Sequence, residues 1–238
     1  MRKTLLRLMP ATAIIISIAM LETQTFGSSM PTTSLVVAQS DNTQAPPQSA
    51  PGPAVLNREI AAAPGEKSEE HFDQARESFL KKDTHAAAIG ILKGAAFLKF
   101  QASRATGEAK KVLTASEREL ERLAGGVEKG TVTSVQDLRR AFARADRALA
   151  EEHLQNAVES WSKKEVDRTG QELKSAADDV ELALSWAGHK LNTTTEAAVK
   201  GAHAAAAKLT EGAAWTRAEV GKGLDAMSKE VGKLRERV

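Results

Sequence analysis

The feature that most limits what this chain can fold into is a long stretch without proline. Five of the seven prolines lie between Gln39 and Pro64, and none lies between Gly65 and Val238. The second stretch is rich in Ala, Glu, Lys, Leu and Arg, which favour helices, whereas proline breaks helix interiors. It shows no sustained alternation of apolar and polar residues of the kind that strands require. The sequence therefore predicts an all-α protein.

One segment of this stretch occurs twice. Residues Glu70–Lys82 read EHFDQARESFLKK, and Glu152–Lys164, 82 positions later, read EHLQNAVESWSKK. Further on, LKGAA at Leu92–Ala96 is matched by LKSAA at Leu173–Ala177 with an offset of 81, so we expect one residue to be gained or lost at the turn. The repeated unit is predicted to be a helical hairpin. Because a single hairpin cannot bury its apolar face alone, two copies would pack into an antiparallel four-helix bundle.

The repeat also predicts which side chains are equivalent. Phe79 should correspond to Trp161 and Leu92 to Leu173, and all four are expected in the core. In the alternative interpretation, the Lys-Lys-acid segments that follow the two repeats are not turns, and the helices run through them.

Composition divides the chain into four parts. Residues 1–38 are predicted to be a signal peptide, because a basic start precedes a mostly apolar run that is too short to span a membrane. Residues 39–66, rich in Pro, Gln, Ser and Ala, are expected to be a disordered tether. Residues 67–190 should form the duplicated-hairpin bundle, and residues 193–238 should form one long amphipathic helix.

The leader determines where the protein is expected to act. Cleavage is predicted after Val36-Val37-Ala38, with Thr25-Phe26-Gly27 as an earlier option. Either site would give a periplasmic or secreted protein. The alternative is an uncleaved N-terminal anchor, and only in that case do we expect contact with a membrane.

Charge and cysteine content exclude several classes of function. The first 38 residues hold three basic residues and one acidic residue, so the remainder carries 30 of each. A neutral chain is a poor candidate for binding nucleic acid, which needs a basic face. There is no Cys, which rules out disulfides and thiolate metal sites.

The C-terminal segment has the most regular apolar periodicity in the chain. The apolar positions are spaced by three or four residues and are Val199, Ala202, Ala206, Leu209, Ala213, Thr216, Val220, Leu224, Met227, Val231, Leu234 and Val238. We predict an interaction helix whose contacts come from Val220, Leu224, Met227, Val231 and Leu234, the larger side chains of the stripe. The helix would self-associate, bind a partner protein, pack along the bundle or lie on a membrane surface. A balanced charge argues against the last alternative.

No motif for catalysis or cofactor binding occurs in the sequence. Phosphate-binding glycine loops, G-x-S-x-G and H-E-x-x-H are all absent, so we expect no enzyme and no cofactor. His71 and His153, which the repeat preserves, are the candidate metal ligands. In the other interpretation they are histidines at the edge of the apolar face, satisfied by a neighbouring acid or by water.

The hairpin pattern A-x-E-S-[FW]-x-K-K-[DE], found at Ala75 and again at Ala157, resembles a tetratricopeptide-type helix pair. More loosely, it is similar to the small exported helical proteins of the YfdX family. The resemblance covers roughly Glu70 to Leu184, and the tetratricopeptide period and its Trp and Pro signatures are absent. It implies binding rather than catalysis. We therefore expect a structural or protein-interaction module of the cell envelope, including a chaperone-like one, or alternatively a carrier of a small ligand or metal near the two histidines.

Overall fold

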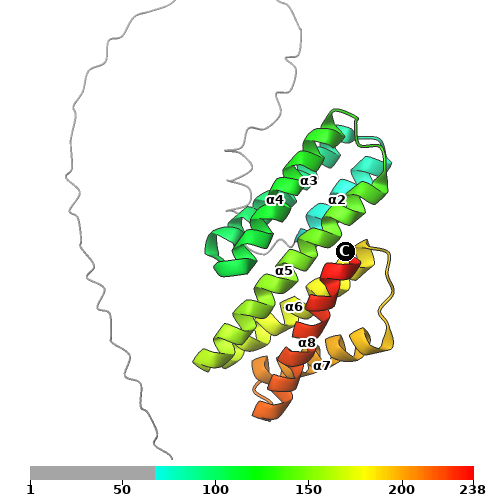
Figure 1. The fold of residues 1–238 in the computed structure, drawn as a ribbon. Helices are drawn as coiled ribbons and strands as arrows, with labels where there is room; N and C mark the ends of the chain where they lie inside the picture. The colour runs from blue at the N-terminus through cyan, green and yellow to red at the C-terminus, as the bar shows by residue number, and fades with distance from the viewer. Residues whose placement is uncertain (1–67) are drawn as a thin grey trace, which may run out of the picture. The chain divides into compact units, whose positions relative to one another are not determined.

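The computed structural model describes residues 68–238, so the predicted signal peptide and tether lie outside the described part. Seven α-helices and no strand make up the described residues, which confirms the all-α prediction (Figure 1). In chain order they are α2 (Ser68–Leu80), α3 (Thr84–Arg104), α4 (Gly107–Glu128), α5 (Val135–Lys163), α6 (Val166–Trp186), α7 (Thr193–Thr210) and α8 (Arg217–Arg237).

The longest helix, α5, is shared by two hydrophobic cores. Its first half, from Leu138 to Leu149, packs with α2, α3, α4 and Trp186. Its second half, from Ala150 to Ala157, packs with α6, α7 and α8. Figure 1 shows α5 running past both groups of helices. The two cores therefore meet at the middle of one helix.

Three aromatic rings occupy the first core. Phe72 of α2 stacks on Phe142 of α5 with ring centroids 4.4 Å apart, and Trp186 of α6 meets Phe142 edge-on at 5.2 Å. Gly94 of α3 provides the space for this stack, because a Cβ at that position would lie 2.3 Å from the edge of the Phe72 ring. The guanidinium of Arg76 covers the Trp186 ring at 5.4 Å. Close helix approach and aromatic packing thus depend on the same glycine.

The second core is built with small residues at helix crossings. A Cβ at Gly170 of α6 would lie 2.9 Å from the carbonyl oxygen of Ala206 in α7. The helices α7 and α8 run antiparallel, since Thr195 near the start of α7 donates a hydrogen bond of 2.7 Å to Glu230 near the end of α8. Alanine and glycine at such crossings let the two helix backbones approach closely.

The two Lys-Lys-acid segments are turns with the same geometry. Lys82 and Lys164 adopt the left-handed conformation at φ 63° and φ 62°, and they are the only non-glycine residues with positive φ in the described part. In each turn the backbone N–H of the following acid donates a hydrogen bond to the backbone carbonyl of the serine five residues earlier. Asp83 bonds to Ser78 at 3.0 Å, and Glu165 bonds to Ser160 at 2.9 Å. This is the Schellman type of helix end. The interpretation in which the helices run through is wrong.

Burial defines the register of the two hairpins. Seven buried positions of α3 coincide with buried positions of α6 at an offset of 82, and the helix caps Asp83 and Glu165 keep the same offset. The expected gain or loss of one residue at the turn is therefore wrong, and Ile91 rather than Leu92 is the counterpart of the buried Leu173. Leu92 is only half-buried because it lies one residue, or about 100° of helix rotation, away from Ile91. The duplication itself stays a prediction.

Phe79 and Trp161 are equivalent in burial but do not lie in the core. Both are half-buried beside the last turn of their helices. Two pairs of equivalent positions in the repeated segment are buried in both copies, Phe72 with Leu154 and Ala75 with Ala157. Each copy therefore buries one larger apolar side chain and one alanine, and the aromatic side chains of Phe79 and Trp161 lie at the margin of the core.

The predicted four-helix region contains a fifth helix. The stripe through Ala102, Ala105 and Ala109 keeps helical spacing, but the chain is extended at Ala105 and Thr106, and α4 begins at Gly107 with φ 60°. Helices α3 and α4 then run antiparallel, because His85 at the start of α3 contacts Glu128 at the end of α4 at 3.0 Å. Both sides of the break are buried, so periodicity alone could not reveal it.

The long C-terminal helix predicted for residues 193–238 is also wrong, since the chain turns back between Thr210 and Arg217. Thr216 caps α8 in a reciprocal capping box with Glu219. The sequence signature Thr-x-x-Glu was present there, and it lies beside the irregular spacing from Thr216 to Val220 to Leu224. Gly212, at φ 70°, supplies the left-handed residue in the turn.

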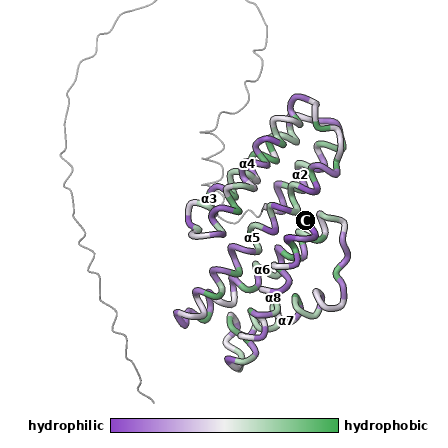
Figure 2. The backbone as a smooth tube through the Cα atoms, viewed as in Figure 1, coloured by the Kyte–Doolittle hydropathy of each residue, from purple (hydrophilic) through white to green (hydrophobic). Residues whose placement is uncertain are grey.

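Within residues 68–238, no helix combines the length and the apolar character needed to cross a bilayer. In Figure 2 hydrophobic and hydrophilic residues alternate along the helices instead of forming long runs of one kind. This is the pattern of helices that each bury one face.

Glycine at position 94 provides a test of the first core. We expect Gly94→Ala to lower the free energy of unfolding by about 1–3 kcal/mol, because the added methyl group would push Phe72 off Phe142. Gly201→Ala is the matched control, since a Cβ there meets nothing within 4 Å. That change should raise stability by up to about 1 kcal/mol through helix propensity. Urea denaturation measures both, and equal effects of the two substitutions would contradict the packing described.

Candidate functional site

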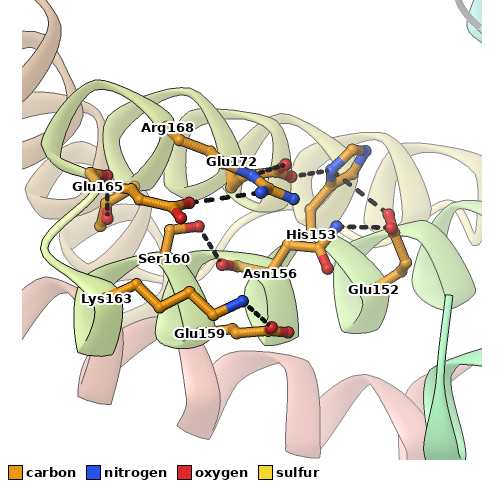
Figure 3. A network of polar contacts seen from close by, with 10 residues as sticks. Glu152, His153, Asn156, Glu159, Ser160, Lys163, Glu165, Arg168 and Glu172 are labelled. Atoms are coloured by element: carbon orange, nitrogen blue, oxygen red, sulfur yellow. Dashed lines mark hydrogen bonds and ion pairs between the residues drawn. The ribbon is translucent and has the colours of Figure 1, made fainter. Parts of the chain in front are cut away.

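The most concentrated polar site lies between α5 and α6, where the two cores meet (Figure 3). The imidazole Nδ1 of His153 lies 2.8 Å from Glu172 Oε2 and 3.5 Å from Glu152 Oε2. On the other side of the ring, Nε2 lies 3.8 Å from a carboxylate oxygen of Asp179. One histidine thus faces three carboxylates from two helices.

Helix geometry explains how the acids converge. Glu172 and Asp179 are seven residues apart on α6, which places them on one face, two turns apart. The antiparallel packing of α5 and α6 brings that face against His153. Asn156, one turn after Glu152 on α5, donates its amide to Glu152 at 2.6 Å. Arg168 extends the network by contacting Glu172 at 3.7 Å and Glu165 at 3.3 Å.

Electrostatics keeps this histidine positively charged. Burial by itself lowers the pKa of His153, but the hydrogen bond to Glu172 and the charges of Asp179 and Glu152 raise it to about 9. Burial raises the pKa of Glu172, and the contact with His153 outweighs that effect and holds it below the usual value. For Glu152 the effect of burial is larger than that of the His153 charge, so the pKa of Glu152 is raised. The site is a buried ion pair with additional acids around it.

A further acid, Asp146, lies buried on α5 two turns before His153. Its side chain is fully buried, and neither carboxylate oxygen has a hydrogen bond of normal geometry within the described part of the chain. Burial raises its pKa well above the usual value, and the charges of Asp179 and Glu69 raise it further. Ser68 and Trp186 lie close enough to offset part of this rise. The protonated form of Asp146 is therefore favoured.

The two histidines predicted as metal ligands have different surroundings. His71 is buried on α2, and His153 is engaged by carboxylates. A metal needs a neutral imidazole, so a histidine held as a cation by acids is a poor ligand. Among residues 68–238, the group whose ligand atoms lie within 4.8 Å of one another consists of Asp178, Glu181 and His203, which includes neither predicted histidine.

The five residues predicted to form an interaction surface lie in the second core. Val220, Leu224, Met227, Val231 and Leu234 are all buried against α5, α6 and α7. The interpretation that this stripe packs along the bundle is the one that agrees with the structure. These side chains could contact a partner only if α8 left the bundle.

A groove lies next to this buried stripe, between the start of α4, the second half of α5 and α8. Its volume is about 690 Å³. The apolar lining comes from Ala109, Leu154, Val158 and Val231, and Val158 is half exposed. The charged lining comes from Glu108, Glu151, Glu159 and Arg235.

The charged side chains that line the groove are mostly acidic. Arg235 of α8 pairs with Glu151 of α5 at 2.9 Å, which ties the two walls together. The other two acids pair with lysines outside the lining, Glu108 with Lys111 at 3.2 Å and Glu159 with Lys163 at 2.5 Å. Exposed pairs of this kind contribute little stability, so a ligand could replace the lysines at small cost.

Sequence reasoning missed Asp146, Glu172 and Asp179. A signal for Asp146 existed, because an acid four residues after Phe142 falls on the apolar face of its helix. Glu172 and Asp179 gave no comparable signal, since their role depends on how α6 is rotated against α5. The groove was also out of reach, because it requires the unpredicted break before α4.

Comparison of the chain with protein-family models, with curated protein sequences and with solved structures finds no match. The resemblance to tetratricopeptide helix pairs and to the YfdX family stays a prediction.

The charge of His153 predicts a pH dependence of stability. Its pKa is about 9 in the folded chain against 6.5 when unperturbed, so its stabilising contribution is fully present below pH 6.5 and is lost as the pH rises through 9. His153→Gln should lower the free energy of unfolding by up to about 3 kcal/mol at pH 6 and by much less at pH 10. Urea denaturation at both pH values measures this. The exposed His189→Gln is the control, and a loss that is independent of pH would contradict the account.

Asp146 predicts a substitution that increases stability. Because its pKa is raised in the folded chain, the unfolded chain ionises first as the pH rises above 3.8, and folding becomes less favourable. Asp146→Asn removes that titration. The variant should gain stability relative to the parent as the pH rises from 3.5 to 7, measured by denaturant titration. Asp225→Asn, at an exposed acid on α8, should show no such trend.

Proposed function

We propose that this chain is a non-enzymatic, exported protein-interaction module of a bacterial cell envelope, and that it binds a helix of a partner protein in the groove between α4, α5 and α8. The observation that carries the proposal is the groove itself, which has an apolar floor, an exposed valine and acidic side chains from α4 and α5. Export rests on the leader sequence at residues 1–38. A chaperone-like role is one form of the same activity.

The shape and lining of the groove favour a helical ligand. A cavity of about 690 Å³ is within the range that accommodates several side chains, and grooves between helices commonly bind the apolar face of an amphipathic helix. Leu154 and Val158 are one turn apart on α5, so they offer contacts at the spacing of such a face.

The charges favour a basic partner. Three glutamates and one arginine line the groove, and that arginine is already paired with Glu151. A helix with lysine or arginine on both sides of its apolar stripe would pair with Glu108 and Glu159 at the walls. An acidic helix would be repelled, which gives the groove selectivity as well as affinity.

The alternative function, a carrier of a small ligand or metal near His71 and His153, has less support. His153 is held as a cation between acids, which opposes metal binding there. Self-association through α8 also has less support, because the apolar stripe of α8 is used inside the chain.

A synthetic peptide tests the groove directly. We expect a helical peptide of leucine and lysine to bind the full chain at least ten times more tightly than a leucine and glutamate peptide of the same pattern. Val158→Glu should lower the affinity for the basic peptide at least tenfold, because it places a charge on the apolar floor of the groove. Isothermal titration calorimetry measures both effects.

The matched control is Leu80→Glu, which introduces the same charge at an exposed apolar side chain of α2 outside the groove. It should leave peptide affinity unchanged. Equal binding of the two peptides, or equal loss in Val158→Glu and Leu80→Glu, would contradict the proposed function.

A further inference from the structure

A second pocket lies at the far end of α5, where α5 turns into α6 and the loop between α7 and α8 passes by. Its volume is about 520 Å³, and its lining consists of Trp161, Ser162, Lys164, Val166, Trp215 and Arg217. It shares only Ser162 with the lining of the groove described above. The pocket is therefore a different site from the groove of the proposed function.

Two of the three tryptophans of the chain form the apolar part of this pocket. The rings of Trp161 and Trp215 meet edge to face, with centroids 5.5 Å apart and planes inclined by 65°. Trp161 is half-buried against the second core, and Trp215 remains 36% exposed on the loop. A rigid aromatic corner of this kind offers a large contact area to a planar or alkyl group.

The charged groups of the pocket are both basic. Lys164 and Arg217 line it, and neither has an ion pair with any residue of the described chain. Of the acids close to them in sequence, Glu165 pairs with Arg168, Glu159 with Lys163 and Glu219 with Lys208, whereas Asp167 in the first turn of α6 is exposed. Both cations of the pocket are therefore available to pair with an anion.

The start of α6 adds to this charge. Val166 is the first residue of α6, and its N-cap, Glu165, makes no side-chain hydrogen bond to the first turn. Free backbone N–H groups and the helix dipole favour an anion at such a position. The left-handed conformation of Lys164 holds this residue beside the same turn.

From the aromatic corner and the two unpaired cations we propose that this pocket binds a small amphipathic acid, a molecule with an aromatic or alkyl body and one carboxylate or sulfonate. The body would pack against Trp161 and Trp215, and the acid would pair with Lys164 and Arg217. The concave shape and the half-buried Trp161 favour a free molecule over an anionic membrane surface, which would need an exposed, convex face.

The test uses fluorescence titration of the full chain with 8-anilinonaphthalene-1-sulfonate, an aromatic sulfonate. We expect one molecule to bind per chain, and the neutral N-phenyl-1-naphthylamine to bind at least tenfold more weakly. Trp215→Ala and the double variant Lys164→Gln/Arg217→Gln should each lower the affinity for the sulfonate at least tenfold. Circular dichroism should show the same helix content and melting curve for every variant, which separates loss of the site from loss of folding.

Lys200→Gln is the control, because Lys200 is an exposed lysine of α7 paired with Glu196 outside the pocket. It should leave sulfonate binding unchanged. Equal affinity for the charged and neutral probes, or unchanged affinity in Trp215→Ala or the double variant, would overturn the proposal. So would binding to phosphatidylglycerol vesicles that depends on the same residues without binding of the free sulfonate.

The outcomes distinguish this site from the groove. Val158→Glu should leave sulfonate binding intact, and Lys164→Gln/Arg217→Gln should leave binding of the basic peptide intact. Either proposal can therefore fail while the other stands.

Discussion

The described structure depends on the packing of α5 into two cores at once. Its first half contributes Phe142 to the aromatic stack with Phe72 and Trp186, and its second half contributes small residues that let α6 approach. Each core needs one half of the same 29-residue helix, so neither core is formed only by helices that are adjacent in the sequence. The groove follows from this arrangement, since α4 belongs to the first core while α8 belongs to the second.

The point where the cores meet is polar, which is costly in itself. His153 and Asp146 lie on α5 on either side of the point where its two halves meet, and Glu172 and Asp179, two of the acid partners of His153, lie on α6. A buried charge pair rarely adds much stability over a well-packed apolar pair, although removal of one partner is strongly destabilising. We infer that this network fixes how α6 is rotated against α5 more than it holds the fold together. Fixing that rotation also sets the direction of the turn that carries Lys164.

Much of the helical content could be predicted from the sequence, and the way the helices pack could not. The absence of proline and the spacing of apolar residues identified the class, and the Lys-Lys-acid turns were located correctly. The break before Gly107 was missed because alanines keep helical spacing on both sides of it. The break before Arg217 was missed because the stripe from Leu209 to Val220 keeps that spacing across it. The predicted site residues failed for a related reason. The repeat places His71 and His153 at the same position of the two similar segments, so it predicts equivalent places on their helices. Which residues each histidine contacts depends on tertiary packing, which the repeat does not reveal.

Native-state hydrogen exchange along α5 tests whether this one helix joins the two cores into a single cooperative unit. We predict that the amides from Ala145 to Ala157 exchange only through global unfolding, with one free energy that equals the value from urea denaturation. The two halves of α5 would then be equally protected. If the second half instead exchanged with a clearly lower free energy than the first, together with α6, α7 and α8, the cores would be independent and the account would be contradicted.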